Sequence, residues 1–183
     1  MITGAMISPA AIERRRQLLL EEIGNFLEMF SYEYEAYLDL ETWEVVPCAI
    51  TPDETTEFYP EEGHRILRIE TRPSHEGFKT MVDFLPYVED ERLRERLYKA
   101  LSHSKPFSHF KNIIYHCDRK LIMQWHNFHN EQLKKAAEEW MKDNKVTIEG
   151  TKLVSPNAKP FYFKEYFSDD LLDDDLFNED DDR

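Results

Sequence analysis

A helical spacing of apolar residues recurs through most of the chain and constrains its fold more than any other feature. Between Ser8 and Phe30, apolar side chains fall three, four or seven residues apart, which places them on one face of a helix. Ser8 suits the N-cap of this helix, and Pro9 suits its first turn. The same spacing predicts further helices over residues 74–143, interrupted at Pro86 and Pro106.

A β unit is predicted between the first helix and the later ones. Aromatic and β-branched residues on both sides of Glu41 and Thr42 predict a hairpin over residues 34–48. Residues 65–71 alternate between apolar and polar and predict a third strand. We therefore expect an α+β fold, a predominantly helical domain with a small antiparallel β-sheet or hairpin near the N-terminus. The expected single domain, residues 1–150, consists of an N-terminal helix (9–30), a β unit (34–71) and a helical part (74–143).

Acidic residues are concentrated at the end of the chain. Residues 165–183 hold ten of the 37 Asp and Glu residues and a single Arg. Such a density of like charge favours disorder, so we expect residues 151–183 to form a flexible aromatic-acidic tail. Four apolar side chains in this tail are suited to docking into a groove on another protein: Leu171, Leu172, Leu176 and Phe177. Alternatively, the tail only keeps the protein soluble, or folds back over the protein's own arginine-rich helices.

The composition predicts a cytoplasmic protein. Cys48 and Cys117 form no CxxC pair and no disulfide framework, which favours reduced thiols. No apolar run reaches the roughly 18–20 residues that a membrane span requires. The first residues lack the apolar core of a signal peptide.

Histidines supply the candidate pocket. His126 and His129 lie three residues apart on a predicted helix, next to Trp125, and these three residues are the predicted pocket. His116, His126 and His129 are weak candidates for metal ligands and would support a metal-dependent enzyme, the third function considered. His129 also falls in an apolar stripe, which favours a structural histidine, so we expect no metal site and no cofactor.

Motifs for catalysis are missing from the sequence. Cys117 follows His116 directly, but neighbours on a helix point about 100° apart and do not form a nucleophile–base pair. Asp39 and Glu41 form a carboxylate pair of the kind that chance produces in an acidic chain. No GxSxG motif is present. We therefore predict no catalytic residues, and the sequence leans against an enzyme.

One predicted helix carries a cluster of basic residues: Arg92, Arg94, Arg96 and Lys99. Acidic residues are interleaved with them, which favours a solvated face with ion pairs. The net charge of −14 also disfavours a nucleic-acid partner. The favoured function is a non-catalytic protein-binding or regulatory module with an acidic interaction tail. The alternative is a nucleic-acid-associated protein that its acidic tail autoinhibits.

Several motifs carry a resemblance to a family: YLDLETWEVV (37–46), SHEGFKTMVDF (74–84), ERLRERLYKAL (91–101), KPFSHFKNII (105–114) and WHNF (125–128), followed by Trp140. With them, residues 37–144 resemble a bacterial family catalogued as uncharacterised protein family 0158. The resemblance implies a fold and a bacterial cytoplasmic setting, and it implies no activity and no site residues. The family usually has two basic residues where this chain has Ser108 and His109, which argues against phosphate binding by that turn.

Overall fold

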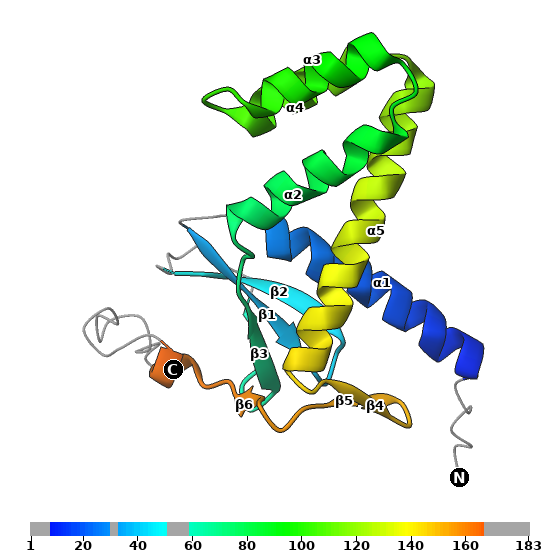
Figure 1. Cartoon of the computed structure of the whole chain (residues 1–183). Coiled ribbons are helices and arrows are strands. Elements are labelled where there is room, and N and C mark those ends of the chain that lie inside the picture. Colours follow the sequence, from blue (N-terminus) through cyan, green and yellow to red (C-terminus); the bar gives the residue numbers. More distant parts are fainter. Residues whose placement is uncertain (1–7, 30–32, 51–58, 167–183) are drawn as a thin grey trace, which may run out of the picture. The chain divides into compact units, whose positions relative to one another are not determined.

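The computed structural model describes residues 8–29, 33–50 and 59–166 (Figure 1). Contacts group the chain into two compact units, which are described separately. The helical unit comprises the described residues of Met1–Ser31 and Ile69–Asp143. The sheet unit comprises the described residues of Tyr32–Arg68 and Asn144–Arg183. The expected single domain over residues 1–150 remains a prediction.

The helical unit contains these elements: α1 (Pro9–Glu28), α2 (Ser74–Phe84), the 3-10 turn η1 (Leu85–Tyr87), α3 (Glu91–Leu101), α4 (Pro106–Tyr115) and α5 (Arg119–Asp143). Side-chain caps are present at two of them, and the Ser8 cap is the one predicted above. The Ser8 side chain accepts a hydrogen bond from the Ala11 amide at 3.2 Å. The Asp90 carboxylate accepts hydrogen bonds from the first amides of α3. Both helices therefore begin where short polar side chains satisfy otherwise unpaired N–H groups.

Aromatic residues fill the core of the helical unit. The Trp125 ring centroid lies 5.1 Å from that of Phe84 and 5.0 Å from that of Phe110. All three side chains are buried. Helix α1 packs along α5 (Figure 1), and at Gly24 the two backbones approach closely, because an added Cβ would lie 3.0 Å from Leu133 Cβ. These contacts hold the C-terminal end of α1 beside the middle of α5.

The sheet unit is built from these elements: β1 (Tyr34–Asp39), β2 (Glu44–Ala49), β3 (Arg65–Ile69), β4 (Thr147–Glu149), β5 (Lys152–Val154), β6 (Lys159–Pro160) and α6 (Phe163–Tyr166). One sheet has the strand order β2-β1-β3-β6, and β4 and β5 form a separate hairpin. β1 and β2 pair antiparallel, with Tyr34 opposite Ala49. The expected α+β fold, mainly helical with strands near the N-terminus, is confirmed.

The structure differs from the expected tail at residues 152–166. These residues form β5, β6 and α6, and Lys159 pairs with Ile66 of β3. Phe161 is 2 % exposed and packs with Tyr37 and Cys48. β6 is only two residues long, so no alternation of apolar and polar residues around residue 159 predicts this strand. The predicted docking residues Leu171, Leu172, Leu176 and Phe177 lie outside the described residues.

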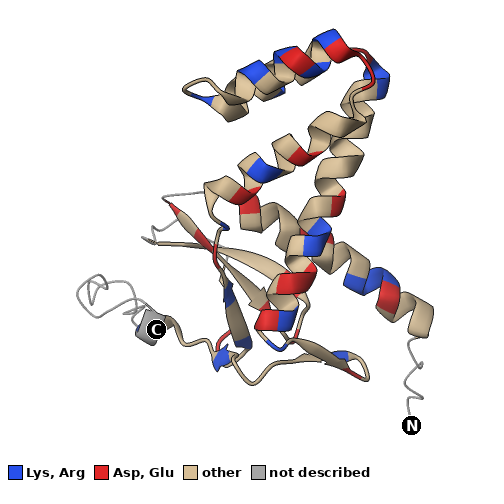
Figure 2. Ribbon diagram, in the orientation of Figure 1, with Lys and Arg blue, Asp and Glu red and all other residues tan. Residues whose placement is uncertain are grey.

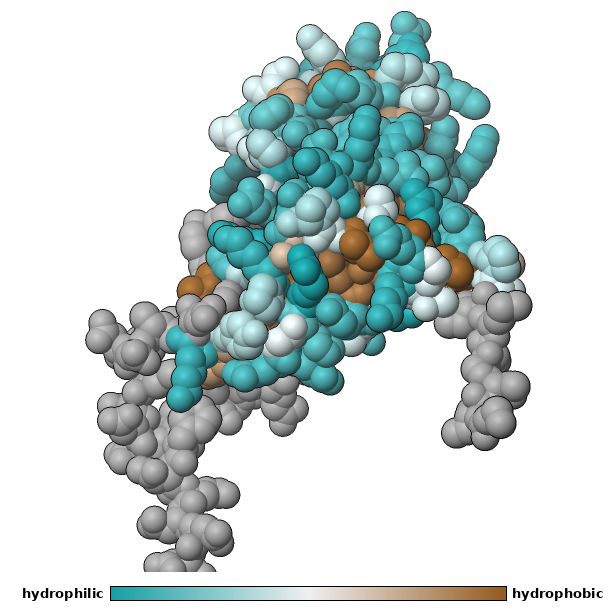
Figure 3. Space-filling view, turned by 90° about the horizontal axis from the view of Figure 1, so that it is seen from below, coloured by the Kyte–Doolittle hydropathy of each residue, from teal (hydrophilic) through white to brown (hydrophobic). Residues whose placement is uncertain are grey.

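Polar residues cover most of the described surface seen in Figure 3, and apolar residues are gathered near its centre. Large apolar side chains of the helical unit are among the exposed ones, including Val82 at 40 % and Tyr98 at 64 %. The helical spacing predicts that Val82 faces the core with Met81, but only Met81 is buried. Val82 instead belongs to a surface of the helical unit.

Candidate functional site

A pocket of about 420 Å³ opens in the helical unit at the N-terminal end of α2. Charged and aromatic side chains form much of its wall: Glu28, Arg72, Lys111, His129, Phe107 and Trp125. The lining also includes the N-cap residue of α2, Pro73, and two residues of its first turns, Ser74 and Gly77. Four helices and the segment before α2 therefore contribute to one site.

Glu28 contacts two other side chains that line the pocket, Arg72 and His129. One of its carboxylate oxygens pairs with Arg72 Nη2, and the other lies 2.9 Å from His129 Nε2. Burial would raise the pKa of Glu28, but the hydrogen bonds and charges of His129 and Arg72 together lower it to about 2. Glu28 is therefore ionised at neutral pH and already has two partners.

Local backbone geometry holds these residues in place. The Arg72 amide donates to the Leu27 carbonyl at 2.8 Å, so the segment before α2 is tied to the end of α1. Glu28 is the last residue of α1 and therefore lies beside Arg72. Gly77 keeps the pocket open on one side, because an added Cβ would lie 3.1 Å from Phe107 Cε1.

The structure brings two of the three predicted pocket residues to this site. Trp125 and His129 line the pocket, and their ring centroids are 5.1 Å apart. His126 is exposed, faces Tyr115 at 5.8 Å and is not part of the lining. Sequence reasoning missed Glu28, Arg72 and Lys111, because no motif distinguishes them in a chain rich in charged residues.

The three weak metal candidates make separate contacts. His116 Nδ1 lies 2.7 Å from the Asn112 carbonyl oxygen, whereas His129 pairs with Glu28. Among residues 8–29, 33–50 and 59–166, no group of three or more His, Cys, Asp or Glu side chains is arranged to hold a metal ion. The hypothesis of a metal-dependent enzyme requires His116, His126 and His129 to lie together, and the structure does not bring them together.

Neither cysteine is arranged as a nucleophile. Cys48 is fully buried, and burial together with the charge of Glu35 raises its pKa to about 12. Burial also raises the pKa of Cys117, whose Sγ lies 3.2 Å from the Ile113 carbonyl oxygen. The apolar spacing of residues 107–117 predicts that Cys117 faces the core, but α4 ends at Tyr115, and Cys117 is only half-buried. Burial therefore favours the protonated form of both thiols, which is the poor nucleophile.

A second polar cluster lies in the sheet unit around Asp39, which is 2 % exposed. Asp39 Oδ1 accepts hydrogen bonds from the amides of Glu41 at 2.9 Å and Thr42 at 3.3 Å. Asp39 Oδ2 lies 2.7 Å from His64 Nδ1, and Glu61 Oε2 lies 3.2 Å from His64 Nε2. Asp39 thus holds the turn between β1 and β2, and it does not form a catalytic pair with Glu41.

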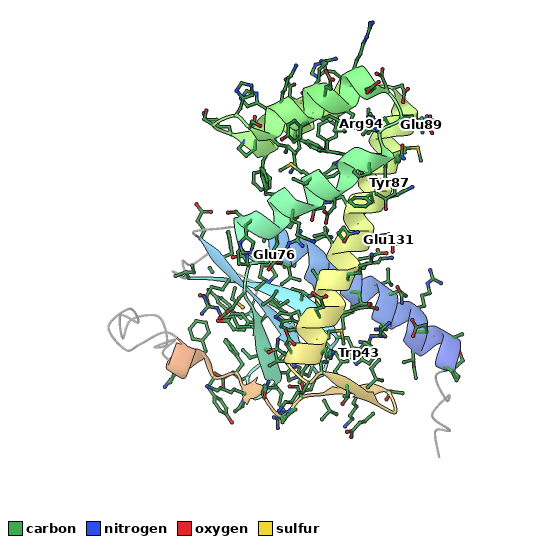
Figure 4. All side chains as sticks on the ribbon, in the orientation of Figure 1. Trp43, Glu76, Tyr87, Glu89, Arg94 and Glu131 are labelled. Atoms are coloured by element: carbon green, nitrogen blue, oxygen red, sulfur yellow. The ribbon has the colours of Figure 1, made fainter. Side chains whose placement is uncertain are left out.

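The basic helix of the sequence is α3, where acidic and basic residues are interleaved along the ribbon (Figure 2). Arg94 extends from α3 toward η1, and its Nη1 lies 3.5 Å from the Val88 carbonyl oxygen (Figure 4). A groove of about 770 Å³ lies against this helix, lined by Val82, Leu85, Pro86, Arg94, Glu95, Tyr98 and Lys99. The groove thus has an apolar floor from α2 and η1 and a charged rim from α3. A nucleic-acid interface on α3 stays a prediction.

Comparisons with known proteins identify a family and supply no activity. The model of the uncharacterised protein family UPF0158 matches residues 34–161. This match covers the resemblance seen over residues 37–144 and extends it through β6. UPF0158 protein PA5073 of Pseudomonas aeruginosa is 32% identical over 131 residues, which are 68% of this chain and 85% of that protein. No solved structure matches the chain. Among the described residues, no helix combines the length and the apolar character that crossing a bilayer demands.

Proposed function

The chain belongs to this uncharacterised family, UPF0158, and we propose that it is a non-catalytic module that binds another protein. The observation that carries the proposal is the groove between α2, η1 and α3. Val82 and Tyr98 expose large apolar surfaces there, at 40 % and 64 %. Exposed apolar side chains rimmed by charge are typical of a surface that a partner covers.

The charge of α3 favours an acidic partner segment. This helix carries four basic and two acidic residues, although the whole chain has a net charge of −14. Arg94 and Lys99 line the groove and attract carboxylates of a partner. Glu95, which lies between them in the sequence, repels carboxylates and so limits the number of acidic side chains that a partner can place there. We infer that the occupant is a short acidic peptide that inserts leucine or phenylalanine side chains against Val82 and Tyr98.

A defined peptide tests this groove. The probe is a fluorescent peptide of sequence DDLLDDDLF, residues 169–177 of this chain, and the control peptide replaces its Leu and Phe with Ser. We expect the probe to bind the protein truncated after Tyr166, which lacks this segment, at least fivefold more tightly than the control. Tyr98→Ser should weaken binding at least fivefold, whereas Tyr115→Ser, an exposed tyrosine on α4 outside the groove, should not. Equal binding of the two peptides, or equal effects of the two substitutions, would contradict the proposal.

The acidic tail is the second element of the proposed function. We propose that Leu171, Leu172, Leu176 and Phe177 dock into a partner protein while the surrounding carboxylates steer the encounter. The truncation that tests this ends at Tyr166, because Phe161 is buried and β6 pairs with β3. Affinity capture with full-length protein should recover a partner that the 1–166 protein loses. Recovery of the same proteins by both would remove the tail from the proposal.

The nucleic-acid alternative gives a different result with the same truncation. If the tail competes with nucleic acid for α3, the 1–166 protein should gain DNA or RNA binding that weakens steeply with salt. The protein-binding proposal predicts no such gain in a mobility-shift assay.

A further inference from the structure

We propose that the pocket at the N-terminal end of α2 binds a small organic anion. The carboxylate or phosphate group of the ligand would lie against Arg72, Lys111 and the first turn of α2. This site lies apart from the groove on α3, and no lining residue is shared between the two. The inference therefore goes beyond the proposed protein-binding function.

The charges of the pocket favour an anion. Two cationic side chains, Arg72 and Lys111, face one carboxylate, that of Glu28. Glu28 is already paired with Arg72 and with His129. Lys111 forms no ion pair with any residue that the structure describes. The pocket therefore holds a net positive charge before His129 is counted, in a chain whose net charge is −14.

Arg72 supplies an observation that is independent of the charge count. Its side chain is 10 % exposed, and its Nε is buried without a hydrogen-bond partner among the described residues. A buried guanidinium that lacks a partner for one donor is costly, and a bound oxyanion, or an adjustment of Arg72 toward it, would relieve that cost. Arg72 lines the pocket, so its guanidinium is placed to serve a ligand there.

The start of α2 adds further donors. Pro73 occupies the N-cap position, and no described side chain caps the helix. The first amides of a helix have no partner within it and favour negative charge. Ser74, the first residue of α2, lines the pocket together with Pro73. An anion at this point would therefore meet both amide groups and cationic side chains.

The size and the aromatic wall of the pocket indicate the rest of the ligand. Its volume of about 420 Å³ falls in the range of small-molecule sites, about 300–1,000 Å³. Trp125 and Phe107 add aromatic rings to a lining that also contains Arg72 and Lys111. A ligand that combines an anionic group with an apolar or aromatic group fits this mixed lining.

Titration calorimetry on the full-length protein tests the site with three probes: phenyl phosphate, benzoate and the neutral benzamide. We expect at least one anion to bind at least tenfold more tightly than benzamide and to shift the NMR signals of the Trp125 indole. The stronger of the two anions identifies the group as phosphate or carboxylate. Lys111→Gln should weaken anion binding at least fivefold. Lys120→Gln, the same charge change at an exposed residue outside the pocket lining, should leave it unchanged.

A second variant does not depend on charge. Gly77→Ala places a Cβ 3.1 Å from Phe107 Cε1 and narrows the pocket, and alanine is a better helix former than glycine. We expect this variant to stay folded and to lose anion binding at least fivefold. No preference for either anion over benzamide, or equal effects of Lys111→Gln and Lys120→Gln, would overturn the inference. Neither result would affect the groove on α3, so failure here is distinguishable from failure of the proposed function.

Discussion

Asp39 Oδ2 lies 2.7 Å from His64 Nδ1, and this contact ties the turn after β1 to the residue before β3. The same carboxylate accepts hydrogen bonds from two amides of the turn, and it is almost fully buried. Asp39→Ala should therefore lower the free energy of unfolding by about 2–4 kcal/mol, because it leaves buried donors without a partner. Urea unfolding monitored by circular dichroism measures this loss.

Glu61→Ala is the matched control for Asp39→Ala. Glu61 also pairs with His64, at 3.2 Å, but its side chain is 81% exposed. An exposed ion pair contributes about 0–1 kcal/mol, so the control should lose little stability. Similar losses from both substitutions would contradict the structural role assigned to Asp39.

Stability should depend on pH through His64. The hydrogen bond with Asp39 raises the pKa of His64 above 6.5, and burial opposes this effect. The negative charges of Asp39, Glu61 and Glu41 raise the pKa further. The folded protein therefore keeps this proton at a pH where the unfolded chain has lost it. The stabilisation is fully present below pH 6.5 and is lost as pH rises through the folded pKa. NMR titration of the His64 ring should give a pKa above 6.5, and His64→Gln should flatten stability in that window.

Glu28 should produce the opposite dependence at acid pH. Its pKa falls from 4.5 to about 2 in the folded protein, so the unfolded chain binds this proton first as pH falls. The stabilisation is present above pH 4.5 and is lost between 4.5 and about 2. The shift corresponds to roughly 3 kcal/mol, with each pKa unit worth about 1.4 kcal/mol. Urea unfolding between pH 2 and 6 measures it, and an identical slope in Glu28→Gln would contradict the assignment.

Much of the fold could be predicted because its signals are local. Ser8 and Asp90 are caps that lie beside the helices they begin, and the hairpin strands adjoin their turn. The strand β6 could not be predicted, because it is two residues long and is defined by its pairing with Arg65 and Ile66. Two residues are too few to show the alternation of apolar and polar side chains that predicts a longer strand such as β3.

The candidate pocket was predictable only in part. Trp125 and His129 share a helix, so their spacing indicated that they lie together. Glu28 and Arg72 are 44 positions apart in the sequence, and they meet because the segment before α2 bonds to the end of α1. Nothing in the local pattern around either residue distinguishes it from the other charged residues of the chain.

The close approach of α1 and α5 gives a prediction about Gly24. A Cβ at this position would lie 3.0 Å from the Cβ and from the carbonyl oxygen of Leu133. Alanine favours the helix by about 1 kcal/mol over glycine, but overpacking costs about 1–3 kcal/mol, and here the neighbouring atoms include backbone. Gly24→Ala should therefore lower the melting temperature. Asn25→Ala, at an exposed position one residue later, should not lower it, and a rise with Gly24→Ala would argue against the close packing.

Phe161 gives the sharpest test of whether residues 159–161 belong to the core of the sheet unit. Its side chain is 2 % exposed and packs against Tyr37, Cys48 and Ile66. Phe161→Ala should cost about 3–5 kcal/mol in the free energy of unfolding, because it leaves a cavity between strands of the sheet unit. Tyr162→Ala removes a neighbouring aromatic that is 43% exposed, and should cost less than about 1 kcal/mol. If both substitutions were equally mild in urea unfolding, residues 159–161 would not belong to the core, and the truncation after Tyr166 would have to be moved toward residue 150.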